Sequence, residues 1–423
     1  MSLENRINFV KENIKDQYLA DNRPWIIGYS GGKDSTAMMQ IIWKALEEIP
    51  EKKRKKELHV LSNNTLVENP LILRWIDENL EYIEKAAINK NFPIKTVKVT
   101  PHLNDTFWVN LIGRGYPAPL SNFRWCTERL KINPTSKYIK DKIDSIGEVI
   151  ILLGTRLDES STRRQTIMKY QISNNRLKRH PYLDLALIFS PIQALKNSDI
   201  WEFLKTNKCQ WEVENEELIA LYKHIDEDDI TLVLDKKIPP SGNSRFGCWV
   251  CTLVDKDKSM QAFVDDGDEW MRPLLEFRDW IKENRNKDEY RMNRRRNGNL
   301  GKGPYTIDKR VLLLRKLLII QKQIKFDLIT DQELKAIQTI WQLDGFHQNV
   351  YFIIKEINEI KESNEMAKND EVKEQHRSDL KDICLKHDVD INSLEKLILE
   401  EKNKSLSVTK KSIQTTILEE MEK

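Results

Sequence analysis

Short apolar runs alternate with amphipathic stretches up to about residue 205. WIIGY (25–29), LHVLSNN (58–64), IKTVKV (94–99) and VIILLGT (149–155) have the length and composition of β-strands. Asp34–Leu46 follows the first run and has apolar residues at helical spacing, as does the stretch through Leu71, Trp75 and Tyr82. Strands that alternate with helices in this way are typical of a parallel sheet covered by helices on both faces. The pattern therefore predicts an α/β domain over residues 1–205.

The remaining chain is predicted to form two further regions. From about Cys209 the alternation fades, and IPPSGNSRFGCWVCT is dense in turn-forming residues and cysteines, so residues 206–310 are expected to form a cysteine-containing, partly helical subdomain. Within it, a helical stretch is predicted from Asp265 to about Arg291, and RMNRRRNGNLGKG (291–303) reads as a basic, flexible segment. Residues 311–423 are expected to be helical, with a tail rich in Glu and Lys after residue 361.

Length and composition exclude several classes of protein. A chain of 423 residues with 39% hydrophobic residues and 11 Trp can bury a substantial core and suits two or three domains. No uncharged apolar stretch is long enough to span a bilayer, and the charged N-terminus lacks the apolar core of a signal peptide, so a cytoplasmic protein that does not bind membranes is expected. The net charge of +3 neither requires nor forbids a nucleic-acid partner. Five Cys are too few for a disulfide framework.

The strongest local motif lies where the first strand turns into the first helix. Two glycines there allow a ligand to approach the backbone, and amides at a helix start attract phosphate groups. The spacing is not that of a Walker A loop, and the competing interpretation is a tight turn with a helix cap. The residues expected to bind nucleotide are Ser30, Gly31, Gly32, Lys33, Asp34 and Ser35.

A second polar cluster, GTRLDESSTRR (154–164), directly follows the strand at 149–155. Ligands of open α/β sheets bind beyond the carboxyl ends of the strands, so this loop is expected to face the same crevice as Ser30–Ser35. Gly154, Arg156 and Arg163 are the candidates there, since a guanidinium group can grip phosphate oxygens. Taken alone, the cluster could equally be a solvated helix cap with local charge pairs.

The cysteines are candidates for a metal site. Cys248 and Cys251 form a CxxC pair flanked by Gly and Trp, which supplies half of a thiolate site for zinc or for an iron–sulfur cluster. No βαβ pattern surrounds the pair, which disfavours a thioredoxin-like redox role. Cys126 lies between aromatic and basic neighbours and could be a nucleophile, a ligand or simply a small buried residue. Cys209 stands apart, and Cys384 lies in the charged tail.

Two basic segments could contact nucleic acid. One is EKKRKKE at 51–57, and the other comprises Arg291, Arg294, Arg295, Arg296 and Lys302, with Tyr290 and Tyr305 nearby. Such stripes can neutralise backbone phosphates regardless of sequence, although a run of charges is more often only a solvated face.

Taken together, these motifs resemble a known family. SGGKDS looks like the PP-loop of ATP pyrophosphatases, which cleave ATP between the α and β phosphates. WIIGYSGGKDST, RWCTERLKINP, VIILLGTRLDESSTRR and GNSRFGCWVCTLVDKDKSM occur in this order in the DndC family, the sulfurtransferase components of bacterial DNA phosphorothioation. That family is similar, over its PP-loop domain, to phosphoadenylyl-sulfate (PAPS) reductases. The resemblance covers about residues 1–310, and the RFGCWVCT block narrows it to this family.

The resemblance implies an activity, cofactors and partners. ATP, with Mg²⁺, would adenylate a non-bridging oxygen of a DNA phosphate, and sulfur from a cysteine desulfurase would then displace AMP. Lys33, Asp34, Arg156 and Arg163 would be the catalytic residues. Members also carry a [4Fe–4S] cluster, here on Cys126, Cys248 and Cys251, with Cys209 as a fourth ligand or an iron left open. Expected partners are DNA, the desulfurase and other phosphorothioation proteins.

Three other functions compete with this one. A PAPS reductase-like sulfonucleotide reductase would not cleave ATP and typically needs a redox-active cysteine near the C-terminus, where Cys384 lacks the expected neighbours. A PP-loop enzyme that thiolates tRNA would prefer RNA to duplex DNA. A module that only senses nucleotide is disfavoured by the complete SGGKDS loop.

Overall fold

The computed structural model describes residues 2–158, 176–222 and 247–359. The chain divides into two compact units, 1–350 and 351–423. The described part of the second unit, 351–359, is helical, and the sheet and both candidate sites lie in the first unit. The domain boundaries expected near residues 205 and 310 both fall within it and stay predictions.

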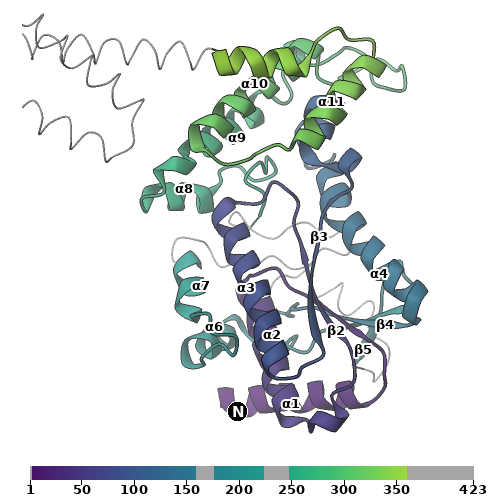
Figure 1. The fold of residues 1–423 in the computed structure, drawn as a ribbon, viewed down its shortest axis with the longest axis vertical. Helices are drawn as coiled ribbons and strands as arrows, with labels where there is room; N and C mark the ends of the chain where they lie inside the picture. Colours follow the sequence, from purple (N-terminus) through teal and green to yellow (C-terminus); the bar gives the residue numbers. More distant parts are fainter. Residues whose placement is uncertain (1, 159–175, 223–246, 360–423) are drawn as a thin grey trace, which may run out of the picture. The chain divides into compact units, whose positions relative to one another are not determined.

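A mostly parallel sheet forms the centre of the fold, as the sequence predicted (Figure 1). The described residues contain six strands in the order β3-β2-β1-β4-β6-β5, and only β5 runs antiparallel to its neighbour. β1 lies between β2 and β4 and is parallel to both, so the strand order reverses there. The strands are β1 (Trp25–Gly28), β2 (Leu58–Asn63), β3 (Ile94–Val99), β4 (Val149–Leu152), β5 (Leu177–Arg179) and β6 (Ala186–Phe189).

Helices cover both faces of this sheet. α2 and α3 lie on one side of the strands and α4 on the other (Figure 1). The four residues of β1 are all buried, which explains why its sequence is continuously apolar rather than alternating. The helices of this part are α1 (Leu3–Leu19), α2 (Lys33–Glu48), α3 (Pro70–Asn89), α4 (Asn133–Ile146), α6 (Asn197–Thr206) and α7 (Asn215–Tyr222).

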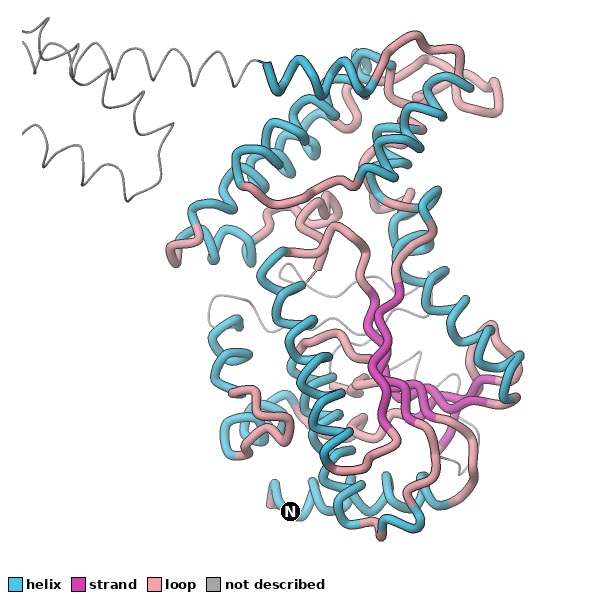
Figure 2. The backbone as a smooth tube through the Cα atoms, viewed as in Figure 1, coloured by secondary structure: helices cyan, strands magenta, loops and turns pink. Residues whose placement is uncertain are grey.

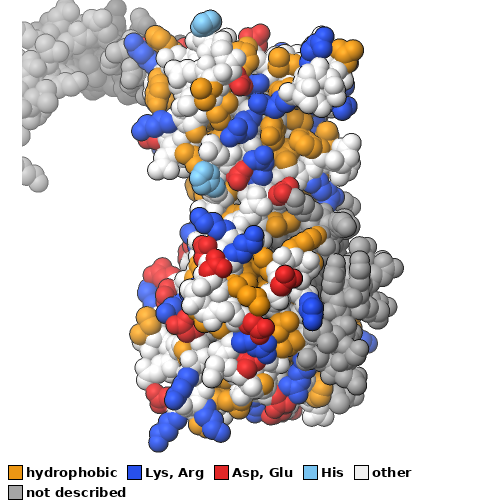
Figure 3. All heavy atoms as spheres, turned by 90° about the vertical axis from the view of Figure 1, so that its right-hand side faces the viewer, with side chains coloured by type: hydrophobic (Ala, Val, Ile, Leu, Met, Phe, Trp, Pro, Cys, Tyr) orange, Lys and Arg blue, Asp and Glu red, His pale blue; other side chains and the backbone are white. Residues whose placement is uncertain are grey.

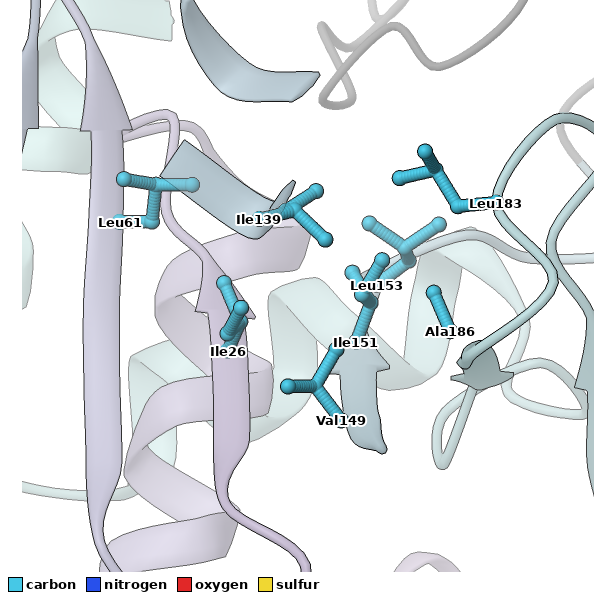
Figure 4. Close-up of a cluster of buried hydrophobic side chains, with 8 residues drawn as sticks. All are labelled: Ile26, Leu61, Ile139, Val149, Ile151, Leu153, Leu183 and Ala186. Carbon is cyan, nitrogen blue, oxygen red and sulfur yellow. The ribbon is translucent and has the colours of Figure 1, made fainter. Parts of the chain in front are cut away.

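A cluster of aliphatic side chains fills the space between the sheet and α4 (Figure 4). Ile26, Leu61 and Ile151 come from three adjacent strands, and Ile139 of α4 packs against them. Burial of each such side chain contributes roughly 1.5–3 kcal/mol. The cluster therefore fixes the positions of β1 and β4, whose carboxyl ends carry the candidate site.

The described residues after 247 form helices and loops (Figure 2). α8 (Lys258–Asp265) ends where the predicted helical stretch from Asp265 to Arg291 begins. That stretch contains the α-helix α9 (Arg272–Asn284), with short 3-10 turns at Glu269–Met271 and Asp288–Tyr290. The region predicted to be helical beyond 311 contains α10 (Ile307–Ile324) and α11 (Asp331–Leu343).

α10 and α11 pack against the segment that leads to Cys126. The indole of Trp341 donates to the carbonyl of Ile112 at 3.1 Å, and that of Trp108 donates to Leu328 at 2.6 Å. Arg310, almost completely buried, donates to the carbonyl of Gly113 at 2.9 Å. Ile112 and Gly113 belong to a π-helical turn, Val109–Gly113, so the later helices hold the backbone just before the cysteine.

The segment at 291–303, predicted to be flexible, is a hydrogen-bonded ribbon. Arg291 pairs with Tyr305 and Arg294 with Leu300 in antiparallel bridges. Across the described part of the chain we find no helix long and apolar enough to cross a membrane. Lys, Arg, Asp and Glu side chains are interspersed on the face seen in Figure 3, which accords with the small net charge.

Candidate functional site

Hydrogen bonds of serine hydroxyl groups within the loop between β1 and α2 hold this loop in a compact conformation. The Oγ atoms of Ser30 and Ser35 share a hydrogen bond of 3.1 Å, and the Ser35 hydroxyl donates to the carbonyl of Gly32 at 3.0 Å. The amide of Ser30 donates to Ser35 Oγ at 3.3 Å. These contacts curl residues 30–35 into a compact turn whose amides sit at the start of a 16-residue helix. Such an N-terminus favours an anionic ligand.

Gly31 is required at its position by both conformation and space. Its φ is +71°, in the region that side-chain-bearing residues rarely adopt, and an added Cβ would lie 2.6 Å from Ile76 Cγ1. The indole of Trp75 donates to the Gly31 carbonyl at 2.9 Å. The first turns of α3 therefore hold the loop from one side.

Arg156 holds the loop from the other side. Its Nε donates to Asp34 Oδ1 at 2.8 Å and its Nη2 to Asp34 Oδ2 at 3.2 Å, with both side chains 3% exposed. A second Nη2 contact, 3.4 Å long, reaches Asn197 Oδ1 at the start of α6. Arg156 thus joins the loops after β1 and β4 to α6.

Gly154 brings the two loops into direct contact. An added Cβ there would lie 3.1 Å from the carbonyl carbon of Asp34 and 3.2 Å from the amide nitrogen of Ser35. Only a residue without a side chain allows the end of β4 to approach the first turn of α2 so closely. The loop after β6 is tied to the same place, since the hydroxyls of Thr155 and Ser190 are 2.9 Å apart.

Lys33 is enclosed by helices distant from it in sequence. Its side chain is fully buried, and its ammonium lies 5.5 Å from the ring centre of Tyr222 and 6.0 Å from that of Trp201. Its backbone amide donates to the Tyr222 hydroxyl at 3.2 Å, and its Nζ is 3.7 Å from Asp34 Oδ2. Sequence reasoning missed Trp201 and Tyr222, because no local signal marks an aromatic residue that packs on a loop far away in the sequence, 189 residues in the case of Tyr222.

The structure therefore brings together nearly all residues that the sequence selected for nucleotide. Arg163 lies outside the described residues. The assembled residues are Ser30, Gly31, Gly32, Lys33, Asp34, Ser35, Gly154 and Arg156. They gather at the carboxyl ends of β1 and β4, where the strand order reverses and where ligands of open α/β sheets bind.

A second site gathers three of the four predicted metal-ligating cysteines. The CxxC turn is attached to the loop after β2, because the amide of Trp249 donates to the carbonyl of Val67 and Glu68 pairs with Cys248 in an antiparallel bridge. Cys126 lies beside this turn and interacts electrostatically with Cys251. Residues far apart in sequence thus meet next to the carboxyl end of β2.

The side chain of Lys131 lies near all three of these cysteines. Its ammonium interacts with Cys126, Cys248 and Cys251 and lies 3.9 Å from Glu68 Oε1. Burial opposes its charge, but the carboxylate of Glu68 and the three sulfur atoms outweigh burial and raise the pKa of Lys131. Sequence reasoning included Lys131 only as part of the RWCTERLK motif and gave it no role.

Burial raises the pKa of two thiols in this site. Burial, assisted by the neighbouring Cys251, raises the pKa of Cys126 to about 12. Burial and the carboxylate of Glu68 raise the pKa of Cys248 as well, and its sulfur lies 3.2 Å from the Thr65 hydroxyl. Both thiols are therefore harder to deprotonate than an exposed cysteine.

Cys209 occupies a different environment. Its thiol interacts with Tyr29 and with the backbone amides of Gln210, Trp211 and Val213, and burial raises its pKa to about 12. Within residues 2–158, 176–222 and 247–359, no contact places it with the other three cysteines.

The family resemblance implied a [4Fe–4S] cluster on these cysteines. Three soft sulfur donors suit iron–sulfur chemistry, but such clusters usually take four. Among the described residues no group of three or more His, Cys, Asp or Glu side chains is placed to hold a metal ion. The described side chains, as arranged, do not form a metal site.

Comparison with known proteins places the first of these sites in a family. Residues 24–253 match the phosphoadenosine phosphosulfate reductase domain, which is more than half of the chain. The chain belongs to this family. The matched range begins just before β1 and ends just after the CxxC turn, so it contains both sites. The PP-loop of this family member is Ser30–Ser35, and its relatives by family are enzymes.

The proteins that are similar to this chain are of several kinds. An uncharacterized protein of Methanocaldococcus jannaschii is 22% identical over 279 residues, and the match spans 64% of this chain but only 46% of that relative. A PAPS reductase from Candida auris shares 12% identity, with 53% of this chain and 94% of that one covered and a TM-score of 0.32. The U34-tRNA thiolase NcsA from Methanococcus maripaludis, which carries a [4Fe–4S] cluster, shares 13% identity, with coverages of 67% and 79% and a TM-score of 0.29. At these TM-scores the likenesses add nothing to the family assignment.

Proposed function

We propose that this PAPS reductase-domain protein is the ATP-dependent sulfurtransferase of DNA phosphorothioation. It would adenylate a non-bridging oxygen of a DNA backbone phosphate with release of pyrophosphate. Sulfur would then replace that oxygen. A cysteine desulfurase and other phosphorothioation proteins would supply the sulfur and complete the system.

The observation that carries the proposal is the braced PP-loop at the switch point of the sheet. The Ser30–Ser35 turn combines helix-start amides with Lys33, and the Asp34–Arg156 ion pair fixes it to the adjacent loop. Pyrophosphate is the leaving group of adenylation, and preorganised amides and a cation stabilise the charge that develops on it. Gly154 and Arg156 lie next to this loop, and we propose that they, together with Arg163, which lies outside the described residues, act on the nucleotide or the target phosphate.

Each step of the proposed reaction balances. A DNA phosphate oxygen attacks the α-phosphorus of ATP, the bond from the α-phosphorus to the oxygen that bridges to the β-phosphorus breaks, and pyrophosphate leaves. Sulfur at the oxidation level of hydrosulfide then attacks the DNA phosphorus, and the bond to the AMP-bearing oxygen breaks. AMP departs with that oxygen and a proton is released, so these two steps need no oxidant or reductant. A persulfide from the desulfurase would first be reduced to hydrosulfide by an external thiol, which is oxidised to a disulfide.

The three-cysteine site is the proposed place of sulfur handling. Cys126, Cys248 and Cys251 supply sulfur donors next to a partly buried cation, Lys131, whose positive charge suits an anionic sulfur species. A [4Fe–4S] cluster on these residues stays a proposal, which the gathering of the three cysteines supports although the described side chains do not form a ready metal site.

The decisive experiment measures pyrophosphate and AMP released from ATP by anaerobically purified protein. Duplex DNA, tRNA or no polymer is added, with and without the sulfur-supplying proteins. Release of both products, stimulated by duplex DNA and lost in Lys33→Met, supports the proposal. Stimulation by tRNA alone would replace DNA by RNA as the substrate, and formation of ADP would refute the pyrophosphatase chemistry.

A second candidate function follows from the family match itself. The family takes its description from PAPS reduction, so residues 24–253 are compatible with a sulfonucleotide substrate. Sulfite release from PAPS in the presence of a dithiol, with no consumption of ATP, would favour this alternative over DNA phosphorothioation.

A further inference from the structure

We propose that the ribbon formed by residues 291–305 binds the backbone of duplex DNA, with Arg294 and Arg295 as its phosphate contacts. The identity of the polymer rests on the proposed function. The shape, exposure and charge of the ribbon support its contact with a nucleic-acid backbone.

The ribbon is a two-stranded hairpin with a tight tip. Beyond its two bridges, the amide of Arg295 donates to the Asn299 carbonyl at 2.8 Å and that of Gly301 donates to Asn293 at 3.0 Å. Gly298 closes the turn with φ of +82°. A two-stranded ribbon of this kind is narrow enough to lie along or enter a groove of duplex DNA.

The base of the ribbon is anchored to the protein body. The amide of Tyr305 donates to the Gly115 carbonyl at 2.6 Å, and the Tyr305 hydroxyl accepts from the amide of Ala118 at 3.2 Å. In the turn of the ribbon, Arg296 donates to the carbonyl of Arg114 at 2.6 Å. The ribbon is therefore held in place at its base and at its turn, by the segment that leads to Cys126.

The tip presents positive charge to solvent. Residues 292–302 are all exposed. Lys302 pairs with Asp288 at 2.9 Å and Arg296 lies 3.8 Å from Asp344, but no carboxylate in the part of the chain described here lies within ion-pair distance of Arg294 or Arg295. Their two charges are therefore available to phosphate oxygens, to which guanidinium groups bind strongly.

The environment of the nearby aromatic residues favours duplex over single-stranded nucleic acid. Proteins that bind single strands stack the bases on exposed aromatic rings. Tyr290 and Tyr305 are only 9% and 2% exposed, so neither can serve as a stacking platform. The exposed apolar residues on the ribbon, Met292 and Leu300, are not aromatic. What remains is contact with the phosphate backbone and the shape of a groove.

The other basic segment of the sequence, 51–57, lies at the edge of the sheet opposite to the PP-loop. It precedes β2, which is parallel to β1, so it sits at the amino ends of strands whose carboxyl ends carry the PP-loop. Lys56 is buried against Asp21 at 3.0 Å, and the guanidinium of Arg54 packs over the Phe92 ring. Lys52 and Lys53 remain exposed and offer a control with the same loss of charge.

The test compares Arg294→Ala/Arg295→Ala with Lys52→Ala/Lys53→Ala in the full-length protein. Binding to a fluorescent DNA duplex is measured by anisotropy between about 50 and 200 mM salt. Loss of two phosphate contacts predicts an affinity at least about tenfold weaker at low salt and a salt slope shallower by about 1.8. The lysine variant should bind within about twofold of the unaltered protein. Arg294→Lys/Arg295→Lys should recover most of the salt slope, and unchanged thermal melting would show that the ribbon variants fold.

The outcomes separate this inference from the proposed function. If duplex binding is unchanged in the ribbon variant, or is lost equally in the lysine variant, the inference is wrong while the proposed function stands. If the ribbon variant loses duplex affinity but no ATP is converted to AMP under any condition, the inference stands and the proposed function fails. Binding of tRNA with none of duplex DNA would overturn both.

Discussion

The guanidinium of Arg156 donates to both carboxylate oxygens of Asp34, a residue 122 positions earlier in the chain. Because both side chains are buried, this ion pair connects the loop after β4 rigidly to the first turn of α2. Asp34 is therefore both part of the PP-loop and the anchor that fixes the loop in place. Substitutions here are expected to affect stability and activity together.

Asp34→Asn should destabilise the protein and abolish pyrophosphate release. The substitution leaves the Arg156 charge buried without its partner, and breaking a buried pair from one side costs about 3–5 kcal/mol. Urea unfolding and a pyrophosphate assay measure the two effects. Arg156→Met alone should cost a similar amount.

The matched control removes both charges together. Asp34→Asn/Arg156→Met removes both partners of this ion pair, although the longer contact of Asp34 with Lys33, at 3.7 Å, is lost without compensation. The free energy of unfolding of this variant should therefore lie closer to that of the unaltered protein than either single variant does. It should still lack activity. Strictly additive losses of stability would show that the two side chains do not interact.

Gly154→Ala should weaken ATP binding with a modest loss of stability. The new methyl group would press on the backbone of Asp34 and Ser35, at 3.1–3.2 Å, and such overpacking costs about 1–3 kcal/mol. Displacement of the loop amides should reduce ATP affinity about tenfold, as measured by calorimetry. Gly147→Ala strains a backbone with φ of +93° but meets no atom within 4 Å, so it should lower stability without changing ATP affinity. Equal ATP affinities for the two variants would contradict this account of Gly154.

The cysteines should separate into two groups on anaerobic reconstitution with iron and sulfide. Cys248→Ser should lower the bound iron and acid-labile sulfide, since Cys248 lies with Cys126 and Cys251. Cys209→Ser should leave both unchanged, because its thiol lies near Tyr29 instead. Loss of iron in Cys209→Ser would make that residue a ligand and would require a rearrangement of this part of the protein.

Lys178 should give the protein a pH-dependent stability in the alkaline range. Burial on β5 lowers the pKa of Lys178 from 10.5 to about 8, so between these two values the unfolded chain binds the proton more than the folded chain does. Its free energy of unfolding, relative to Lys178→Met, should therefore rise as the pH increases from 8 to 10.5 and be lowest below 8. Urea unfolding of both proteins at about pH 7 and pH 10 measures this difference. A difference that does not vary with pH would show that Lys178 is not perturbed by folding.

The sequence by itself determined the elements whose signals are local. The apolar run 25–29, the two glycines and the following amphipathic stretch predicted a strand, a tight turn and a helix, and the structure contains all three, while phosphate binding by the turn stays a prediction. The alternation of such units predicted the parallel sheet correctly, because burial on both faces imposes continuous apolar strands. The CxxC spacing likewise identified a cysteine turn without showing what it faces.

Only the tertiary structure decided what these local elements meet. The pairing of Arg156 with Asp34, the enclosure of Lys33 by Trp201 and Tyr222, and the position of Lys131 among three thiols join residues from separate strands and helices. The same holds for the ribbon at 291–305, which sequence alone took for a flexible segment. Packing and burial create these contacts, and they depend on the order of the strands in the sheet and on the helices around it. The spacing of residues along the chain therefore does not predict these contacts.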